Sequence, residues 1–384
     1  MMEIPPRPKG SLISHFSRMA IRHGGVNLAQ GRPGFSPPEE LVTSLREILR
    51  EPDVHQYAPG NGDFDLLESI AGLYKSPVPL TPDHVLVVNG ATEAMSLIFL
   101  MLASDPARKG AVLSFSPLYE SYPKLGSIFS RPFIEVPVDP DTLAIDLDRV
   151  EDLVVRHEVK IILVASPGNP LGRIWTREEW SRLREISLQH DVHVLHDAVY
   201  EAIYFREPPR PTIDPEFPGH LFISAFSKTL CITGWRIGYI IADADTMERL
   251  RAVHDYTGLS SPYLLQRAIA RYLALPRALK TFTRDLRVRC RHSFTRLKNG
   301  LSELGFRVSP AEGGMFLWAR LPEGYDDGYE FAVRLFEASK VAVVPGENFM
   351  ASPSPYIRLN IAQELPTIDE ALDRMGEFIT HIYR

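Results

Sequence analysis

The sequence predicts an α/β protein in which a mostly parallel, seven-stranded sheet is flanked by helices and joined to a smaller α+β domain. Three observations support this fold class. Short apolar runs alternate with helical patterns between residues 84 and 245. A charged helical stretch then extends from residue 260 to residue 304, and a mixed segment closes the chain. At 384 residues the chain is also too long for one ordinary core.

Each expected strand of the large sheet is a short, mainly apolar run, as suits a strand that is buried on both faces. The runs lie at residues 85–88, 111–113, 133–136, 160–164, 192–195, 221–223 and 237–241. Helical patterns such as the one at 177–190 connect them, which favours parallel neighbours. Ligand chemistry is then expected at the carboxyl ends of the strands.

Two domains are expected from this pattern. The alternating region with its flanking helices predicts a large domain over residues 36–275. Further strands at 314–318, 341–344 and 356–359 predict a small domain that comprises residues 1–35 and 276–384.

Composition excludes several classes of protein. The formal net charge of −6, without a run of basic residues, argues against a nucleic-acid-binding surface. The longest apolar stretch, 94–103, is far shorter than the roughly 20 residues that span a bilayer. The amino terminus has no secretory pattern. Only Cys231 and Cys290 occur, which fits the reducing cytoplasm, although a bond between them stays open.

A lysine and an arginine follow the expected strand at 221–223. Lys228 lies in Ser-Ala-Phe-Ser-Lys-Thr at 224–229, next to the hydroxyl of Ser227, and Arg236 lies in Gly-Trp-Arg-Ile-Gly at 234–238. Such an amine can form a Schiff base, and hydroxyl and guanidinium groups can bind a phosphate. The alternative is a surface turn with scattered basic residues, which does not explain a Gly-Trp-Arg-Ile-Gly segment that enters a buried strand.

Asp197 and Tyr200 follow the strand at 192–195. A poorly solvated aspartate stays ionised when it faces a cation, such as the protonated ring nitrogen of a pyridine cofactor. Tyr200 could donate to a phenolic oxygen on the same ring. An aspartate that caps the next helix explains the position of Asp197 equally well.

Three other strand ends carry candidate contacts, each weak on its own. Asn169, in the rigid turn Pro-Gly-Asn-Pro at 167–170, could donate to the same phenolic oxygen, but this is also an ordinary turn sequence. Ala91 and Thr92 start a helix whose amino terminus suits a phosphate, although plain strand-to-helix turns are more common. Tyr119 could stack on a cofactor ring or fill the core.

Arg358 and Gly31 are candidates for binding a substrate carboxylate. Arg358 alternates with apolar neighbours on an expected strand, so it faces either solvent or a site. The backbone at Gly31 is unobstructed by a side chain. Lysine, aspartate and phosphate donors at successive strand ends together match the needs of pyridoxal 5'-phosphate (PLP). No metal ion is expected.

With these residues the chain resembles the class I/II aminotransferases of PLP fold type I over nearly its whole length. The matching segments are Gly31, Gln-Tyr-Ala-Pro at 56–59, Gly-Ala-Thr-Glu-Ala at 90–94, Pro-Leu-Tyr at 117–119, Pro-Gly-Asn-Pro at 167–170, Asp-Ala-Val-Tyr-Glu at 197–201, Ser-Lys at 227–228, Gly-Trp-Arg-Ile-Gly at 234–238 and Ile-Arg-Leu at 357–359.

The resemblance implies a role for each of these residues. Lys228 is expected to be the Schiff-base lysine and general base, and Asp197 the partner of the ring nitrogen. The other implied cofactor contacts are Asn169 and Tyr200 at the phenolic oxygen, Ala91, Thr92, Ser227 and Arg236 at the phosphate, and Tyr119 on the ring. Tyr57 is expected to reach the phosphate of a neighbouring subunit, which implies a homodimer with shared active sites. Arg358, Asn169 and the backbone of Gly31 are expected to hold the substrate α-carboxylate.

Within the family, segments 14–20, 27–31 and 253–256 resemble the kynurenine/methionine aminotransferase branch. An apolar or aromatic amino acid, or methionine, is the expected amino donor, with glutamine as the next candidate and a 2-oxo acid as the acceptor. Three residues depart from the family pattern. Ala225 lacks the usual hydroxyl, Leu171 replaces a threonine, and Arg32 precedes Pro33. Arg32 touches either an acidic substrate side chain or, more in keeping with its residue type, a surface ion-pair partner.

Three other functions are weighed against transamination. A cysteine S-conjugate β-lyase or a decarboxylase would use the same lysine and cofactor. A non-catalytic PLP-binding regulator is a remote alternative, because no helix-turn-helix pattern precedes Gly31. A nicotinamide-dependent dehydrogenase is excluded, since Gly-Asn-Gly at 60–62 is followed by Asp65 in place of the third glycine.

Overall fold

A seven-stranded sheet forms the centre of the computed structural model, which describes residues 4–209, 213–214, 216–352 and 354–382. The strands are β2 (Val85–Val88), β3 (Ala111–Ser116), β4 (Phe133–Pro137), β5 (Val159–Ala165), β6 (His193–Asp197), β7 (His220–Ala225) and β8 (Gly238–Ile241). Their order is β2-β8-β7-β6-β5-β3-β4, and only β8 pairs antiparallel with its neighbours. All seven predicted runs are therefore strands of one mostly parallel sheet.

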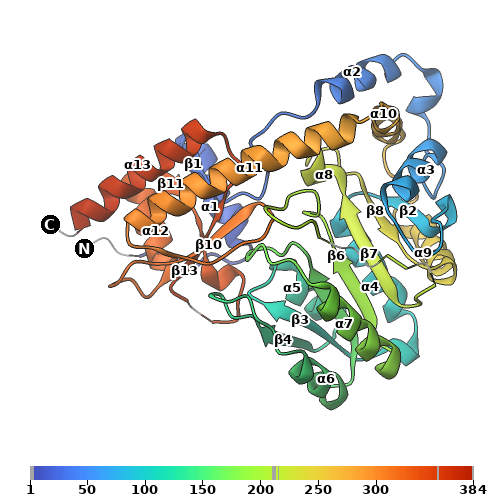
Figure 1. The fold of residues 1–384 in the computed structure, drawn as a ribbon, viewed down its shortest axis with the longest axis horizontal. Coiled ribbons are helices and arrows are strands. Elements are labelled where there is room, and N and C mark those ends of the chain that lie inside the picture. Colours follow the sequence, from blue (N-terminus) through green and yellow to red (C-terminus); the bar gives the residue numbers. More distant parts are fainter. Residues whose placement is uncertain (1–3, 210–212, 215, 353, 383–384) are drawn as a thin grey trace.

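Helices cover both faces of this sheet (Figure 1). On one face α6 (Leu147–Arg156) and α7 (Arg177–His190) pack together, and on the other α4 (Ala91–Ala103) packs against α9 (Ala244–Thr257). The helix predicted at 177–190 is confirmed at both ends. It starts with a capping box, in which Thr176 and Glu179 each accept the backbone N–H of the other.

Further helices complete the large unit. They are α2 (Glu39–Ile48), α3 (Phe64–Leu73), α5 (Ser121–Ile128), the short α8 (Phe226–Thr229) and α10 (Tyr263–Leu273). Among them, α3 contacts the edge strand β2. The stretch predicted as one helical run from 260 to 304 is two helices, α10 and α11 (Ala278–Glu303). The break at 274–277 contains Pro276, which cannot continue a helix.

A second, smaller layered unit follows α11. Its four-stranded sheet has the order β12-β13-β10-β9, with β9 (Arg307–Val308), β10 (Phe316–Arg320), β12 (Val344–Pro345) and β13 (Tyr356–Asn360). Its helices are α1 (Leu12–His23), α12 (Gly328–Ser339) and α13 (Leu365–Ile382). The amino-terminal β1 (Val26–Asn27) pairs in parallel with β11 (Val341–Ala342), so the first residues join the carboxyl-terminal unit.

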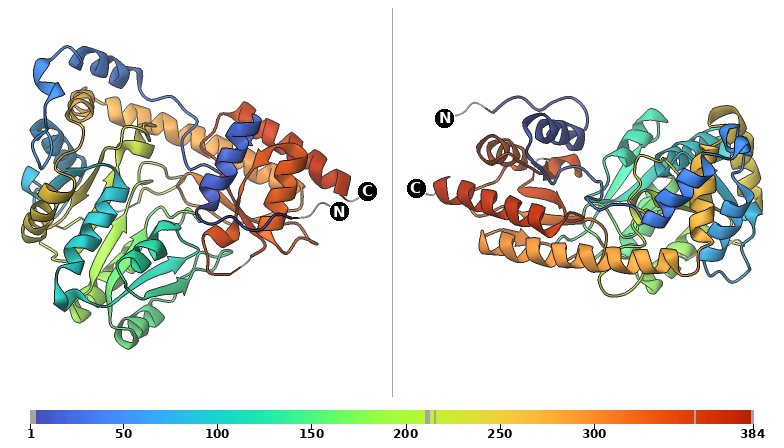
Figure 2. Two further views of the ribbon diagram at one scale, coloured as in Figure 1. Left: turned by 180° about the vertical axis from the view of Figure 1, so that it is seen from behind. Right: turned by 90° about the horizontal axis from the view of Figure 1, so that it is seen from above.

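The long helix α11 runs beside α13 and also contacts α10, so it connects the small sheet with the large one (Figure 2). The residue boundaries predicted for the two domains remain a prediction. Cys231 and Cys290 are both free thiols. Over the described part of the chain, no helix has the length and apolar character needed to cross a membrane.

Candidate active site

A cleft of about 1130 Å³ opens at the carboxyl ends of the parallel strands, between the large sheet and residues of the small sheet. It gathers side chains from segments that are far apart in the sequence. Eleven of the twelve predicted site residues line it: Gly31, Ala91, Thr92, Tyr119, Asn169, Asp197, Tyr200, Ser227, Lys228, Arg236 and Arg358. Tyr57 does not belong to the lining, and its side chain is 82% exposed.

Lys228 lies in α8, directly after β7. Its Nζ donates a 2.5 Å hydrogen bond to the carbonyl oxygen of Gly31. Burial, together with the positive charges of Arg358 and Arg236, lowers the pKa of the amine to about 8. A larger fraction of this amine than of an ordinary lysine is therefore uncharged near neutral pH, as a nucleophile or proton acceptor requires.

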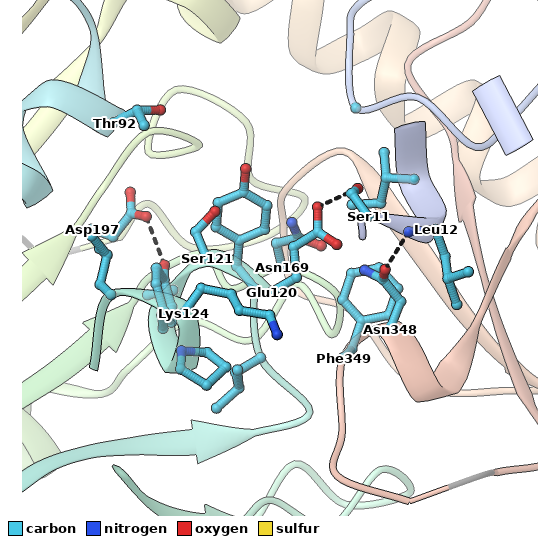
Figure 3. Close-up of a pocket in the computed structure, with 18 of the residues that line it drawn as sticks. Ser11, Leu12, Thr92, Glu120, Ser121, Lys124, Asn169, Asp197, Asn348 and Phe349 are labelled. Carbon is cyan, nitrogen blue, oxygen red and sulfur yellow. Dashed lines mark hydrogen bonds between the residues drawn. The ribbon is translucent and has the colours of Figure 1, made fainter. Parts of the chain in front are cut away.

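Asp197 is the last residue of β6 and is 8% exposed. The Tyr122 hydroxyl donates to Oδ2 at 2.6 Å, a bond drawn at Asp197 in Figure 3, and the Val199 N–H donates to Oδ1 at 3.3 Å. Burial raises the pKa of this carboxyl, and these hydrogen bonds and the charge of Lys228 oppose the rise. A turn follows Asp197 instead of a helix, so the interpretation as a helix cap was wrong.

Arg236 and the start of α4 form one end of the cleft. The Arg236 guanidinium donates to the carbonyl oxygens of Thr233 (3.1 Å) and Asn89 (3.2 Å). Gly90 precedes α4 with a φ of 81°, and a Cβ there would lie 2.5 Å from Nη2 of Arg236. Only glycine therefore allows the guanidinium to approach the helix amino terminus, where backbone N–H groups and the helix dipole favour an anion.

The turn between β7 and α8 contributes Ala225 and Ser227 to the same cleft. Ala225 is the last residue of β7 and supplies only a methyl group. Ser227 is buried and adds a hydroxyl two residues later. Ser227, Thr92, Arg236 and the α4 amino terminus are therefore the candidate anion donors at this end of the cleft.

Arg358 occupies the opposite end and is fully buried on β13. Its Nη1 donates to Oδ1 of Asn169 at 3.1 Å and its Nη2 to the carbonyl oxygen of Ala29 at 2.5 Å. Phe316 and Phe349 pack against the guanidinium, 4.0 and 4.8 Å from its carbon to the ring centroids. Burial lowers the pKa of Arg358 to about 10, so it remains a cation, and it forms no ion pair with any residue that the structure describes.

Two predicted aromatic residues lie between these ends. Tyr119 lines the cleft, and its ring meets that of Tyr122 edge-on at 5.7 Å. Tyr200 meets Phe316 edge-on at 5.6 Å, and burial raises the pKa of its hydroxyl, so it remains a proton donor.

Sequence reasoning missed several polar side chains at the site. Tyr122 donates a hydrogen bond to Asp197, and its only signal in the sequence was its position three residues after Tyr119. Glu120 also lines the cleft, where its Oε1 accepts a 2.6 Å hydrogen bond from the Ser11 hydroxyl. Neither Glu120 nor Ser11 was predicted, because nothing local in the sequence indicates that residues 109 positions apart meet.

A buried hydrogen-bond network supports the strand ends from behind. Glu201 accepts from the hydroxyls of Tyr74 (2.5 Å) and Ser224 (2.8 Å), and the Tyr74 and Tyr239 hydroxyls are 2.6 Å apart. Burial raises the pKa of the Glu201 carboxyl to about 7. The network connects the turn after Asp197 with β7 and β8, which carry the residues around Lys228.

The remaining departures from the family pattern lie outside the polar site. Leu171 is buried in the main hydrophobic core, which accounts for an apolar residue there. Arg32 is exposed and does not line the cleft. No ion pair connects Arg32 to any other residue that the structure describes, so the surface ion pair considered for it is not seen.

Comparison with known proteins identifies the family. The model of the family "Aminotransferase class I and II" matches residues 23–375. The solved N-succinyldiaminopimelate aminotransferase from Mycobacterium tuberculosis is 30% identical with a TM-score of 0.89, over 96% of this chain and 97% of that one. The aspartate aminotransferase from Thermus thermophilus with maleate is 26% identical with a TM-score of 0.88, over 96% and 97% of the two chains.

A curated relative adds to this result. The methionine aminotransferase of Escherichia coli is 28% identical over 389 residues, which cover 97% of each chain, in agreement with the branch that the sequence resembles. The structural neighbours share PLP fold type I. The chain belongs to the class I and II aminotransferases.

Proposed function

We propose that this aminotransferase binds PLP through Lys228 and transfers the α-amino group of an L-amino acid to a 2-oxo acid. The observation that carries the proposal is one cleft with three chemically distinct positions. An amine and a carboxylate, Lys228 and Asp197, lie between an anion site at Arg236 and a second cationic site at Arg358.

The residues present fit the cofactor. A dianionic phosphate requires several donors, and the α4 amino terminus, Thr92, Ser227 and Arg236 supply them at one end of the cleft. Because Gly90 has no Cβ, the Arg236 guanidinium can lie close to that amino terminus. Asp197 would face the ring nitrogen, Asn169 and Tyr200 the phenolic oxygen, and Tyr119 the ring.

The protein's own groups supply the proton chemistry. When bound, PLP acts as an electron sink for negative charge at the substrate Cα. The Asp197 carboxylate, fixed by Tyr122, favours a protonated ring nitrogen. The Lys228 amine, with its pKa lowered to about 8, takes a proton from one carbon and returns it to another.

Arg358 orients the substrate. Two of its donors are occupied by Asn169 and Ala29, which fix the guanidinium plane, and Nε has no protein partner among the described residues. A substrate α-carboxylate would give this buried cation its counter-ion. An apolar or aromatic donor, or methionine, fits the apolar residues Leu12, Ile13, Phe316, Phe349 and Met350 that line this part of the cleft.

The surface around Tyr57 supports a homodimer as part of this proposal. Tyr57 and Tyr256 are 82% and 93% exposed, and Leu259 is 49% exposed. The loop at Gly60 packs against Asp255 and Leu259, so these exposed apolar groups lie on adjoining segments. A second subunit would cover them and place Tyr57 of the partner subunit at the phosphate site. The free thiols of Cys231 and Cys290 support a cytoplasmic location.

The visible absorption spectrum of the purified protein with PLP tests this function. A Schiff-base band that bleaches on addition of single L-amino acids, and returns with a 2-oxo acid, is expected. Release of 2-oxo acid and ammonia without an amino acceptor would indicate β-elimination instead, and release of CO₂ a decarboxylase. A protein that shows no band with PLP would contradict the proposal.

A further inference from the structure

Glu120 places a negative charge inside the cleft. It directly precedes α5, and its Oε1 accepts the hydrogen bond from Ser11, which belongs to the segment before α1. Figure 3 shows the two side chains pointing toward each other. Among the described residues Glu120 forms no ion pair, and its only hydrogen-bond partner is this neutral hydroxyl. Oε2 is therefore available to a ligand.

The carboxylate lies at the substrate end of the cleft. Glu120 is one of the groups whose negative charge partly opposes the lowering of the pKa of Arg358, together with the hydroxyls of Tyr200 and Tyr119. It is the only carboxylate among these groups. Because Glu120 and Arg358 line the same cleft, the side chain of a substrate held by Arg358 would have an acidic neighbour.

The other cations that line the cleft do not offset this charge. Arg7 is engaged by Glu347 at 2.8 Å and by Asp327 at 3.2 Å. Arg236 belongs to the opposite end, at α4. Lys124 lies one helical turn after Glu120, but its side chain is exposed and forms no ion pair with another described residue. Figure 3 shows its amine apart from the Glu120–Ser11 pair.

We propose that Glu120 determines substrate specificity by excluding amino acids with an anionic side chain and by accepting a hydrogen bond from a neutral or cationic one. This inference rests on the proposed function and assigns its substrate class. A second carboxylate on the substrate would meet a partly desolvated like charge, whereas an amide donor would find an acceptor at Oε2. The contrast is with the Thermus thermophilus relative, whose solved structure contains the dicarboxylate maleate.

Glutamine and glutamate are the sharpest pair of substrates, because they differ by one charge at nearly constant shape. In the wild-type holoenzyme we expect kcat/KM for glutamine to exceed that for glutamate by at least about tenfold, as like-charge contact is costly in a desolvated site. Glu120→Gln retains an acceptor for Ser11 and should reduce this ratio by about tenfold, mainly through glutamate. Methionine, which carries no charge, serves as the reference and should change by less than about threefold.

Two control variants change a different charge in the same cleft. Glu135→Gln, on the edge strand β4, removes an acidic group that also lines the cleft, and the ratio should stay at its wild-type value. An equal shift in Glu135→Gln would show a general effect of cleft charge and overturn the assignment to Glu120. A wild-type preference for glutamate that Lys124→Gln abolishes would overturn it as well, because Lys124 would then bind the distal carboxylate.

Binding of maleate separates this inference from the proposed function. Calorimetry on wild type and Glu120→Gln, with isovalerate as the monocarboxylate control, requires no turnover. We expect maleate to bind Glu120→Gln at least about tenfold more tightly than wild type, and isovalerate to bind both about equally. Equal maleate affinities would contradict the role of Glu120 even in an active enzyme. If Glu120→Gln binds maleate more tightly but the protein has no transaminase activity, the role of Glu120 would be supported and the proposed function would be contradicted.

Discussion

The two faces of β6 carry buried ionisable groups with perturbed pKa values, but only one face belongs to the cleft. Asp197 faces the cleft, where the Tyr122 hydroxyl and the charge of Lys228 act on it. The preceding residue, His196, points to the opposite face, because side chains alternate along a strand. There it packs 4.4 Å from the ring of Trp180 on α7, near His220 on β7.

The histidine cluster shows that a shifted pKa does not by itself indicate a functional site. Burial lowers the pKa of His196 far below its usual value, and it lowers that of His220 to about 4. These two histidines are neutral at pH 7, pack against Trp180, and are not among the residues that line the cleft. Asp197 differs because a cavity, a lysine and two arginines converge on the same space.

Removal of the Lys228 amine should have the largest effect on the cleft side. We expect Lys228→Ala to reduce kcat by about 10⁴-fold or more, because the general base is lost. The stability of the apoprotein should not fall. A folded pKa of about 8, below the usual 10.5, means that the buried charge destabilises the fold below pH 8, and this penalty disappears as the pH rises through the unfolded value. Activity assays and thermal unfolding at pH 7 measure both effects.

Neutralisation of Asp197 should come next. Asp197→Asn retains the shape of the side chain and is expected to lower kcat by about 10²- to 10³-fold through loss of a preorganised charge. PLP binding should weaken but persist, since the phosphate donors remain. Single-turnover kinetics and cofactor titration provide the two readouts, and unchanged kinetics would show that another group faces the ring nitrogen.

Replacement of the Arg358 guanidinium group is expected to have a smaller effect. Arg358→Lys retains the positive charge but loses the planar pair of donors that Asn169 and Ala29 orient. We expect kcat/KM for the amino donor to fall by about 10- to 100-fold, the equivalent of one or two charged hydrogen bonds. The absorption band of the bound cofactor should be unchanged, and a shifted band would place Arg358 nearer the cofactor than we propose.

Replacement of a histidine on the face opposite the cleft should change the stability of the fold and leave the activity unchanged. The folded pKa of His220, about 4, lies below the unfolded value of 6.5. The unfolded chain therefore takes up a proton first, and stability should fall as the pH drops below 6.5, by up to about 1.4 kcal/mol per pH unit for this residue. His220→Phe should lessen the decrease of the thermal midpoint between pH 7 and pH 5. Its kcat at pH 7 should match that of wild type, and a large loss would place the cluster within the catalytic machinery.

The sheet and the cofactor end of the cleft were predictable from sequence because their signals are local. Each strand is a mainly apolar run, and Asp197, Lys228 and Arg236 lie within three residues of a strand end. The topology of a parallel sheet then brings such ends to one edge. The split between α10 and α11 was also readable in principle, since Pro276 marks it.

Contacts between distant segments were not predictable. The bond from Lys228 to Gly31 spans 197 positions, and that from Arg358 to Ala29 spans 329. The hydrogen bond of Glu120 depends on where the segment before α1 lies, which no local pattern reveals. Substrate selection, which depends on such contacts, is therefore less accessible from sequence than cofactor binding.

The most direct test of the central assignment is chemical trapping of the cofactor. The PLP-loaded protein is reduced with borohydride, digested and analysed by peptide mass spectrometry. The account predicts one pyridoxyl modification, on the peptide that contains Lys228, and none in Lys228→Ala. A stable modification of a different lysine in wild type, or loading of Lys228→Ala at the same level, would contradict it.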